Sequence, residues 1–491
     1  MLPYKNLLII DKENNIAVFK QIALQFIRLI QEGKLLPGTA LPSTRTLAFD
    51  LELHRKTVTA AYECLVSEDW VDSVPRKGFV VSPNLPVVRP RTYHEGRIAA
   101  YESEPGFEYD EFVNFSYSPL VSQKSDIVID DGFPDVKLLP VNAILQEYRR
   151  TLNYRALKKL SLGWELEGSL EFRDALCNFL NVTRGLDIEV KNLLTTRGAQ
   201  MAIYVAASII IKPGDKVIVG EPSYLFASML FERLGAELIR IPVDNYGMQT
   251  EIIEEVLKTN TVKLMYVIPH HHHPTTVTMS VERRNQLLQL IKKYQIAVIE
   301  DDYDYDFQFQ YDPYLPLASG NHDGNIIYIG SLTKVLGTPF RLGYIVAAEK
   351  FIKAAAKKRM LVDLRGDVLN EQVVSGLIKN GELTRLIQKA NKLYRKRCHF
   401  LSELLNTKLG EVVEFKRPTG GMAIWLCINS DFELTKILDK TAAKGLKVIG
   451  STYNKGSNAK YNAFRFGFGS LNVEELEKAV EIFKTTIDTM K

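Results

Sequence analysis

Apolar and polar residues follow helical spacing through much of the first 82 residues. Apolar side chains recur every three or four positions in three stretches, which predicts three short amphipathic helices. Ser43 directly precedes the second helix and is expected to cap it by accepting a backbone hydrogen bond. Residues 70–71 and Gly78–Val81 then have the composition of two small strands. The residues expected to face the core of this block are Val18, Ile22, Phe26, Ile30, Leu47, Ala48, Leu51, Val58, Ala61, Tyr62 and Leu65.

From about residue 126 onward, strand-like apolar runs alternate with helical patterns. The clearest runs are 217–219, 262–268, 296–299 and 326–329, and a helix is expected over 280–293. Such alternation predicts an α/β domain with a largely parallel sheet. The intervening segment 83–125 is rich in proline and charge and is expected to be a linker. The predicted domains are therefore 1–82 and 126–491, joined by 83–125.

Length and composition narrow the class of protein. A chain of 491 residues is too long for one core, and its 46% hydrophobic and 24% charged residues are typical of a soluble globular protein. The net charge of +4 does not by itself predict a nucleic-acid partner. Four widely spaced cysteines fit a reducing compartment and argue against a disulfide framework or a cysteine-based zinc site. Neither a signal peptide nor a membrane-spanning run is apparent, so a cytoplasmic protein is expected.

The second and third predicted helices carry a candidate function. A tight turn joins them, and the third begins with Arg55, Lys56 and Thr57. This is the helix-turn-helix pattern of DNA-binding proteins, with Lys77-Gly78 at the tip of a small wing. The alternative is a helical dimerisation cap with a solvated charged face, because residues 1–82 hold ten Lys and Arg against nine Asp and Glu. The pattern alone leaves both interpretations open.

The block resembles the signature of GntR-type winged-helix domains over residues 33–70, which read GKLLPGTALPSTRTLAFDLELHRKTVTAAYECLVSEDW. The resemblance implies binding to double-stranded operator DNA, with phosphate contacts supplying most of the affinity. Glu52 stands where a glycine is usual in the turn, and His54 stands where a serine is usual. The residues expected to contact DNA are Ser43, Arg45, Arg55, Lys56, Thr57, Lys77 and Gly78.

A second candidate site follows the predicted strand 326–329, in the segment GSLTKVLGTPFRLG at 330–343. Lys334 lies just past the strand, between the hydroxyl residues Ser331 and Thr333 and ahead of Arg341. A lysine amine can form a Schiff base with an aldehyde cofactor, and hydroxyls and a guanidinium can hold its phosphate. Most lysines after strands are simply solvated, so this segment alone does not establish a cofactor site.

Other loops add compatible chemistry. The backbone of Gly198–Gln200 opens a predicted helix and would make a phosphate cradle, although a plain strand–helix turn is the alternative. Tyr224 could stack on a flat ring or simply pack. Asp301 ends a predicted strand, where a carboxylate could pair with a protonated pyridine nitrogen or, alternatively, bind Mg²⁺.

Together these segments resemble fold-type I enzymes dependent on pyridoxal 5'-phosphate (PLP), the aspartate aminotransferase superfamily. The resemblance also includes GFPD at 132–135, RG at 184–185, PGD at 213–215 and FRFGF at 464–468. It implies a large α/β domain with a mainly parallel sheet and a smaller α/β subdomain.

The resemblance also assigns site residues. Lys334 would form the Schiff base with PLP, and Arg465 would bind the carboxylate of an incoming amino compound. Asp301 would pair with the pyridine nitrogen, with Asp302 as the alternative if the register slips, and Tyr303 would bond the ring hydroxyl. The residues assigned to the phosphate are Gly198, Ala199, Gln200, Ser331, Thr333 and Arg341.

The run His270–His273 has two interpretations. Four consecutive histidines suggest metal binding or a tag remnant. The run also follows a predicted strand, where the family has a histidine-containing loop at the edge of the cofactor, and His271 matches the family histidine. We favour the second interpretation, which assigns no metal.

A GntR-type winged helix, a linker and an aminotransferase-like domain, in that order, resemble the MocR/GabR family of bacterial regulators. The family implies a homodimeric transcriptional regulator that senses an amino compound, or PLP itself, through aldimine chemistry at Lys334. One alternative is an active PLP-dependent aminotransferase with an attached DNA-binding domain. Another is a regulator whose PLP fold serves only as a dimerisation scaffold. The effector, the operator and the sign of regulation stay open.

Overall fold

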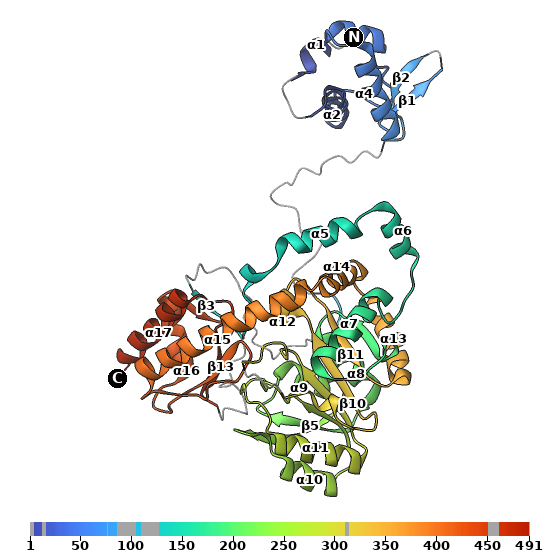
Figure 1. Cartoon of the computed structure of the whole chain (residues 1–491). Coiled ribbons are helices and arrows are strands. Elements are labelled where there is room, and N and C mark those ends of the chain that lie inside the picture. The colour runs from blue at the N-terminus through green and yellow to red at the C-terminus, as the bar shows by residue number, and fades with distance from the viewer. Residues whose placement is uncertain are drawn as a thin grey trace. The chain divides into compact units, whose positions relative to one another are not determined.

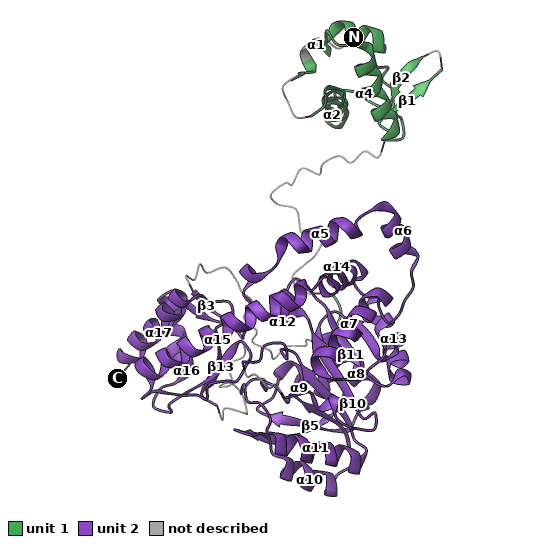
Figure 2. Cartoon of the chain, viewed as in Figure 1, with its two compact units in different colours: residues 1–113 green, residues 114–491 purple. Residues whose placement is uncertain are grey.

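The computed structural model of the chain describes residues 4–11, 16–75, 77–85, 105–109, 127–309, 314–449 and 461–490. The chain divides into two compact units, residues 1–113 and 114–491 (Figure 2). Most of the predicted linker 83–125 lies outside the described residues. None of the helices that the structure describes is long and apolar enough to cross a membrane.

The N-terminal unit is a small helical bundle with a hairpin, as the sequence predicts (Figure 1). Its elements are α1 (Tyr4–Leu7), α2 (Val18–Gln31), α3 (Thr44–Asp50), α4 (Arg55–Ser67) and the antiparallel strands β1 (Val71–Val74) and β2 (Gly78–Val81). Tyr62 is fully buried, and its ring lies 5.7 Å from that of Phe26 and 4.8 Å from that of Phe79. The predicted core residues are buried except Val18 and Leu51, which are half-buried.

Local signals set the geometry of the α3–α4 pair. The Ser43 hydroxyl accepts a hydrogen bond from the Thr46 amide at 3.1 Å, which confirms the predicted cap. Glu52, in the turn between the helices, has a φ of 55°, the left-handed region that glycine adopts most easily. The usual glycine at this position is therefore replaced by a residue that keeps the same turn.

The larger unit is built on an eight-stranded sheet in the order β4-β11-β10-β9-β8-β5-β6-β7. The five consecutive strands from β10 to β6 in this order run parallel, and the pairings at both ends are antiparallel. This confirms the predicted, largely parallel sheet. The strands are β4 (Leu193–Thr196), β5 (Lys216–Glu221), β6 (Glu237–Asp244), β7 (Gly247–Met248), β8 (Val262–Val267), β9 (Ala297–Asp302), β10 (Ile326–Ser331) and β11 (Gly343–Val346).

Helices cover both faces of this sheet. Along β5, Val217 and Val219 belong to one apolar core and Ile218 belongs to the other, because successive side chains of a strand point to opposite faces. The helices α8 (Ala199–Ile210), α9 (Leu225–Arg233) and α13 (Glu349–Asp363) contribute to the first core. The helices α7 (Leu170–Arg184), α10 (Thr250–Thr259), α11 (Val281–Tyr294) and α14 (Val368–Lys379) contribute to the second.

A smaller α/β subdomain completes this unit (Figure 1). A three-stranded sheet, β12-β13-β15, packs with the long helix α15 and with α17. The short strand β3 pairs in parallel with β14. Residues near 127 therefore belong to the smaller subdomain, together with residues near 446. The remaining elements are α5 (Val141–Thr151), α6 (Tyr154–Leu162), α12 (Thr333–Leu336), α15 (Glu382–Leu409), α16 (Leu434–Ala443), α17 (Val473–Asp488), β3 (Ile127–Ile129), β12 (Val413–Glu414), β13 (Ala423–Ile428), β14 (Leu446–Val448) and β15 (Ala463–Gly467).

Candidate functional site

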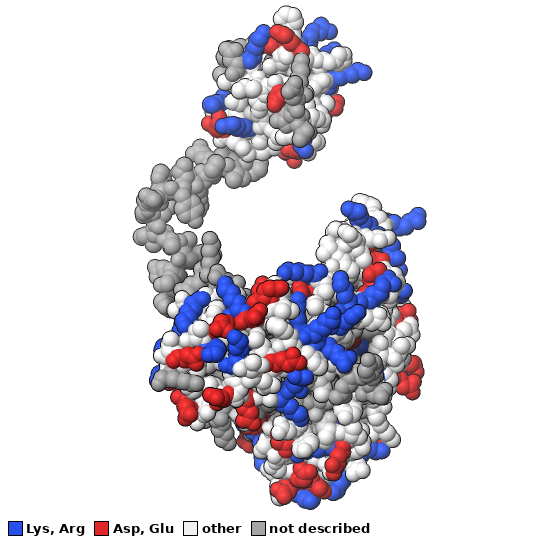
Figure 3. Space-filling model, turned by 60° about the vertical axis from the view of Figure 1, so that its left-hand side comes forward, with Lys and Arg blue, Asp and Glu red and all other residues white. Residues whose placement is uncertain are grey.

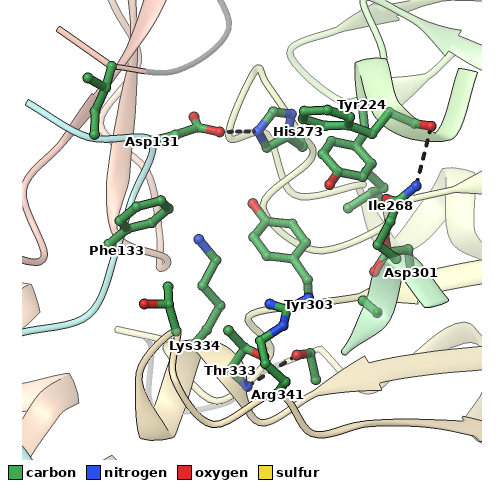
Figure 4. A pocket seen from close by; sticks show the side chains of 16 residues that line it. Asp131, Phe133, Tyr224, Ile268, His273, Asp301, Tyr303, Thr333, Lys334 and Arg341 are labelled. Atoms are coloured by element: carbon green, nitrogen blue, oxygen red, sulfur yellow. Dashed lines mark hydrogen bonds and ion pairs between the residues drawn. The ribbon is translucent and has the colours of Figure 1, made fainter. Parts of the chain in front are cut away.

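A cavity of about 480 Å³ lies in the larger unit where the parallel strands end. Adjacent parallel strands present their carboxyl ends at one edge of a sheet, which is where α/β proteins bind ligands. Figure 4 shows Lys334, Tyr303 and Asp131 pointing into the same space. The residues expected from the sequence that line the cavity are Ala199, Gln200, Tyr224, Asp301, Tyr303, Ser331, Thr333, Lys334 and Arg341. Gly198 and Arg465 adjoin this lining. An added Cβ on Gly198 would lie 2.9 Å from Arg341 Nη2, and Arg465 Nε lies 2.7 Å from Asp131 Oδ1.

Lys334 is held in a position that favours its neutral amine. It lies on α12, one short turn past the end of β10, and its Nζ donates to the Gly132 carbonyl oxygen at 2.7 Å. Burial lowers the pKa of the Lys334 amine, although the nearby Asp131 carboxylate acts in the opposite direction. A lysine with a lowered pKa has a larger fraction of the unprotonated, nucleophilic form.

Asp301 is a buried carboxylate with one oxygen left unsatisfied. Its Oδ2 accepts a hydrogen bond from the Tyr266 hydroxyl at 2.6 Å, whereas Oδ1 has no hydrogen-bond partner among the described residues. Burial raises the pKa of Asp301 to about 7, and the nearby Asp302 and Asp304 carboxylates act in the same direction. An unpaired buried oxygen is costly, so this site favours a cationic donor such as a protonated ring nitrogen.

Asp302 points away from the cavity. Successive side chains of β9 face opposite sides of the sheet, so Asp301 and Asp302 cannot share one site. The Oδ2 atom of Asp302 accepts from the Tyr328 hydroxyl at 2.9 Å, and its Oδ1 lies 3.3 Å from His270 Nδ1. At the end of β9, Asp301 rather than the alternative Asp302 therefore faces the cavity.

The start of α8 forms an anion cradle with Arg341. Gly198 precedes the helix with a φ of +84°, and an added Cβ would lie 2.9 Å from Arg341 Nη2. The first backbone amides of a helix have no partner within it and carry partial positive charge. The guanidinium of Arg341 adds a full positive charge beside them. Ser331 and Thr333 line the same cavity from the end of β10 and the start of α12.

The side chains around the cavity match the chemical groups of PLP. The unsatisfied oxygen of Asp301 matches a pyridine nitrogen, and the cradle at Gly198 and Arg341 matches a phosphate. Lys334 supplies a primary amine in the same cavity, and the side chains of Tyr224 and His273 provide aromatic wall. When bound, PLP supplies an aldehyde carbon that binds primary amines covalently and reversibly.

Replacing Gly198 by alanine is expected to weaken PLP binding by about tenfold or more, or about 1.4 kcal/mol. The new Cβ would displace Arg341 from the phosphate cradle, because it would lie 2.9 Å from Arg341 Nη2. Gly214→Ala is the matched control, because Gly214 has a φ of +87° but no described atom within 4 Å of an added Cβ. Equilibrium dialysis of PLP measures both variants. Equal losses of affinity would contradict the cradle.

The four histidines of the run have four different partners. The Nε2 atom of His270 lies 2.7 Å from the Tyr314 carbonyl oxygen, His271 Nδ1 lies 3.0 Å from Asp304, and His272 Nδ1 lies 3.0 Å from Thr275. The last ring, that of His273, bonds Asp131. Burial lowers the pKa of His272 to about 3, so this ring is neutral.

The structure differs from the expectation for His271. Its side chain is not among those that line the cavity, whereas His273 is. The backbone of His271 has a φ of 44°, and its ring bonds Asp304 within the protein interior. Sequence reasoning missed His273, although its position directly before Pro274 at the end of the run was a usable signal. It also missed the wall residues Asp131, Phe133, Phe226, Ile268, Thr338 and Ile449.

Ligand atoms of His270, Glu300 and Asp302 also approach one another, within 4.8 Å. These side chains already have hydrogen-bond or ion-pair partners within the protein. Glu300 accepts hydrogen bonds from the Leu317 and Ala318 amides at 2.7 and 2.8 Å, and Asp302 contacts His270. Burial raises the pKa of Glu300 to about 8. The three residues form a buried polar network on the opposite side of β9 from the cavity.

In the N-terminal unit, the beginnings of α3 and α4 lie together. The Nε atom of Arg55, at the start of α4, donates to the Thr44 hydroxyl at the start of α3 at 3.3 Å. Ser43, Arg45 and Lys56 are exposed beside them, and neither helix has an acidic residue in its first turn. Two helix N-termini with exposed basic side chains suit phosphate groups. Thr57 is half-buried, and Lys77 and Gly78 are exposed at the hairpin.

The basic character at the beginnings of α3 and α4 does not come from the net charge of the N-terminal unit. Lys and Arg side chains of the small unit are interspersed with Asp and Glu (Figure 3). The arrangement therefore depends on where the basic residues lie along α3 and α4 rather than on their number.

Comparison with known proteins agrees with both units. Residues 133–483 match the family "Aminotransferase class I and II", and residues 19–81 match "Bacterial regulatory proteins, gntR family". The uncharacterized HTH-type transcriptional regulator YdfD of Bacillus subtilis (strain 168) is 26% identical, with 96% of each chain covered. The aromatic-amino-acid aminotransferase 1 of Thermococcus litoralis is 27% identical over 75% of this chain and 89% of the relative.

A solved structure shows the same fold in the larger unit. The kynurenine aminotransferase of Pyrococcus horikoshii matches with a TM-score of 0.68 and 27% identity, over 75% of this chain and 92% of the other. The matched family and these relatives identify PLP as the cofactor for which the cavity is built. The chain therefore belongs to the aminotransferase class I and II family and carries a GntR-family helix-turn-helix domain ahead of its PLP fold.

Proposed function

We propose that the chain is a transcriptional regulator that binds operator DNA and uses PLP to sense an amino compound at Lys334. The observation that carries this proposal is the presence, in one chain, of an intact PLP cavity and a helix-turn-helix domain. In this proposal residues 1–82 bind DNA, residues 126–491 bind the effector and residues 83–125 connect them. Operator binding would place the protein in the cytoplasm. PLP itself is a second candidate effector.

Each part of the cavity has a proposed role. Asp301 would hold the pyridine nitrogen of PLP, Tyr224 would contact its ring, and Tyr303 would bond its hydroxyl. Arg341, Ser331, Thr333 and the start of α8 would hold its phosphate. Lys334 would supply the amine that binds its aldehyde, and an effector amine would compete with Lys334 for that group.

Signalling requires an effector that binds two states of the protein with different affinity. The segment at Gly132 is suited to this role. Its carbonyl oxygen accepts from Lys334 Nζ, and β3, just before it, pairs with β14 of the smaller subdomain. A change at Lys334 would therefore act on the segment that leads toward the DNA-binding domain.

We also propose a homodimer. Apolar side chains are exposed along α5, α6 and the residues that follow, and such a patch typically marks a protein interface. Two DNA-binding domains in one assembly would raise affinity for paired half-sites. The exposed residues are Val141, Leu145, Leu152, Tyr154, Leu157, Leu162 and Trp164.

An active aminotransferase with an attached DNA-binding domain is the second candidate function. It is favoured by the complete cofactor cavity and by the relative named as an aromatic-amino-acid aminotransferase. An enzyme forms many molecules of oxo acid per protein chain, whereas a sensor forms few or none.

The deciding experiment uses the full chain loaded with PLP. Random-sequence duplexes are selected for binding, and formation of oxo acid from amino donors is followed in parallel. A regulator selects a recurring DNA sequence and forms product slowly or not at all. Many turnovers together with no selected sequence would instead favour the enzyme.

A further inference from the structure

The guanidinium of Arg465 is already engaged by a carboxylate of the same chain. Arg465 is buried, with 4% of its surface exposed, and its Nε lies 2.7 Å from Asp131 Oδ1. Its Nη1 donates to the Pro274 carbonyl oxygen at 3.3 Å, and its Nη2 lies 3.5 Å from the Tyr303 hydroxyl. The Nη1 and Nη2 atoms therefore have hydrogen-bond partners within the chain, and Nε forms a close ion pair with Asp131 that lacks hydrogen-bond geometry.

The position of Asp131 is fixed from two sides. Its Oδ2 lies 2.9 Å from His273 Nε2, a contact drawn in Figure 4. Gly132 follows with a φ of +82°, and an added Cβ there would lie 3.3 Å from Arg465 Nη2. Burial alone would raise the pKa of Asp131, but the hydrogen bond from His273 and the charge of Arg465 hold it below its usual range. The carboxylate is therefore ionised at neutral pH.

This pairing changes what the cavity can accept. A carboxylate arriving at Arg465 would meet the negative charge of Asp131 at close range and would compete with it for the guanidinium. Displacing Asp131 would leave a buried charge without its main partner, which is strongly unfavourable. An amine that lacks a carboxylate leaves the pair intact, and Phe133, whose ring lies 5.0 Å from Lys334 Nζ, can contact its carbon chain.

We propose that Asp131 determines effector specificity and that the effector is a primary amine without a carboxylate group. This inference rests on the proposed sensing function at Lys334. The resemblance assigned Arg465 to an effector carboxylate, whereas in this structure the carboxylate at that guanidinium is the protein's own.

Three matched amines test the proposal. The first is 1-aminobutane, the second is L-norvaline, which adds a carboxylate at the amine-bearing carbon, and the third is 4-aminobutanoate, in which a carboxylate replaces the terminal methyl. Each is titrated into the full chain loaded with PLP, and the shift in visible absorbance gives the dissociation constant. We expect 1-aminobutane to bind at least about tenfold more tightly than either carboxylated amine.

The variant Asp131→Asn removes the internal competitor and keeps the side-chain shape. It should bind the two carboxylated amines at least about tenfold more tightly than the wild type does, because the negative charge that competes with them at Arg465 is then gone. Asp174→Asn, which removes an exposed carboxylate from α7, should leave all three affinities unchanged.

Wild-type protein that prefers either carboxylated amine would overturn the proposal, and this result does not depend on the variant folding. Unchanged carboxylate affinity in an Asp131→Asn protein that still holds PLP would do the same. A wild-type protein that fails to hold PLP at all contradicts the sensing function itself, so the two failures are distinguishable.

Discussion

Replacing Lys334 by alanine is expected to abolish covalent retention of PLP, with a loss of apparent affinity of more than about 100-fold. Lys334 supplies a primary amine to the cavity. Burial lowers the pKa of this amine and so raises the fraction in the reactive neutral form. The contacts of Asp301 and of the phosphate cradle with PLP would remain, but they are noncovalent. Gel filtration followed by a visible absorbance spectrum measures the retained cofactor.

The control for this experiment is Lys353→Ala. Lys353 lies on α13 of the same unit, is exposed, and pairs with Glu349 four residues earlier at 2.6 Å. Its removal makes the same change in charge and should leave the absorbance as in the wild type. A Lys334→Ala protein that retains as much cofactor as the wild type after gel filtration would contradict the role of Lys334.

Replacing Arg55 by alanine is expected to weaken DNA binding by about 10- to 100-fold, which corresponds to about 1–3 kcal/mol for one specific contact. Arg55 starts α4, and its Nε donates to Thr44 at the start of α3. The change therefore removes a positive charge from the place where two helix N-termini meet. Fluorescence anisotropy with a selected duplex measures the loss.

Arg28→Ala is the matched control for Arg55. Arg28 lies on α2, is exposed, and pairs with Glu32 at 2.7 Å, so its charge is already balanced. Its loss should change DNA affinity by less than about threefold, since exposed ion pairs contribute little. If the two variants lost affinity equally, the α3–α4 face would not be the DNA-binding surface.

Local signals made the N-terminal unit predictable. Its helices follow apolar residues at a period close to 3.6, and Ser43 caps α3 through a contact only three residues away. The strands of the larger unit were also evident, because both faces of the sheet are buried and the runs are continuously apolar. The expected strand 296–299 proved too short, since β9 extends through Asp302. Acidic residues at the end of a strand favour the prediction of a loop, because the sequence does not show the buried partners that stabilise them.

The contacts that shape specificity were not predictable from the sequence. The pairing of Asp131 with Arg465 joins residues more than 300 positions apart, and no spacing rule connects them. The choice of His273 over His271 at the cavity depends on a left-handed turn inside a run of identical residues. Both depend on how the smaller subdomain and the loop after β8 meet, which local propensity does not encode.

The exchange of amines at Lys334 has a different use in a sensor than in an enzyme. In both, the cavity binds an amine through the same residues, so the cavity alone does not separate the two functions. What separates them is whether amine binding changes the affinity of the chain for DNA.

The most direct test measures that coupling. DNA affinity of the full chain loaded with PLP is determined by anisotropy on a selected duplex, with and without saturating 1-aminobutane, for wild type and for Lys334→Ala. We expect a change of at least about fivefold in the wild type, which corresponds to an allosteric coupling of about 1 kcal/mol or more, and no change in the variant. Equal DNA affinity with and without any amine that demonstrably binds at Lys334 would contradict it.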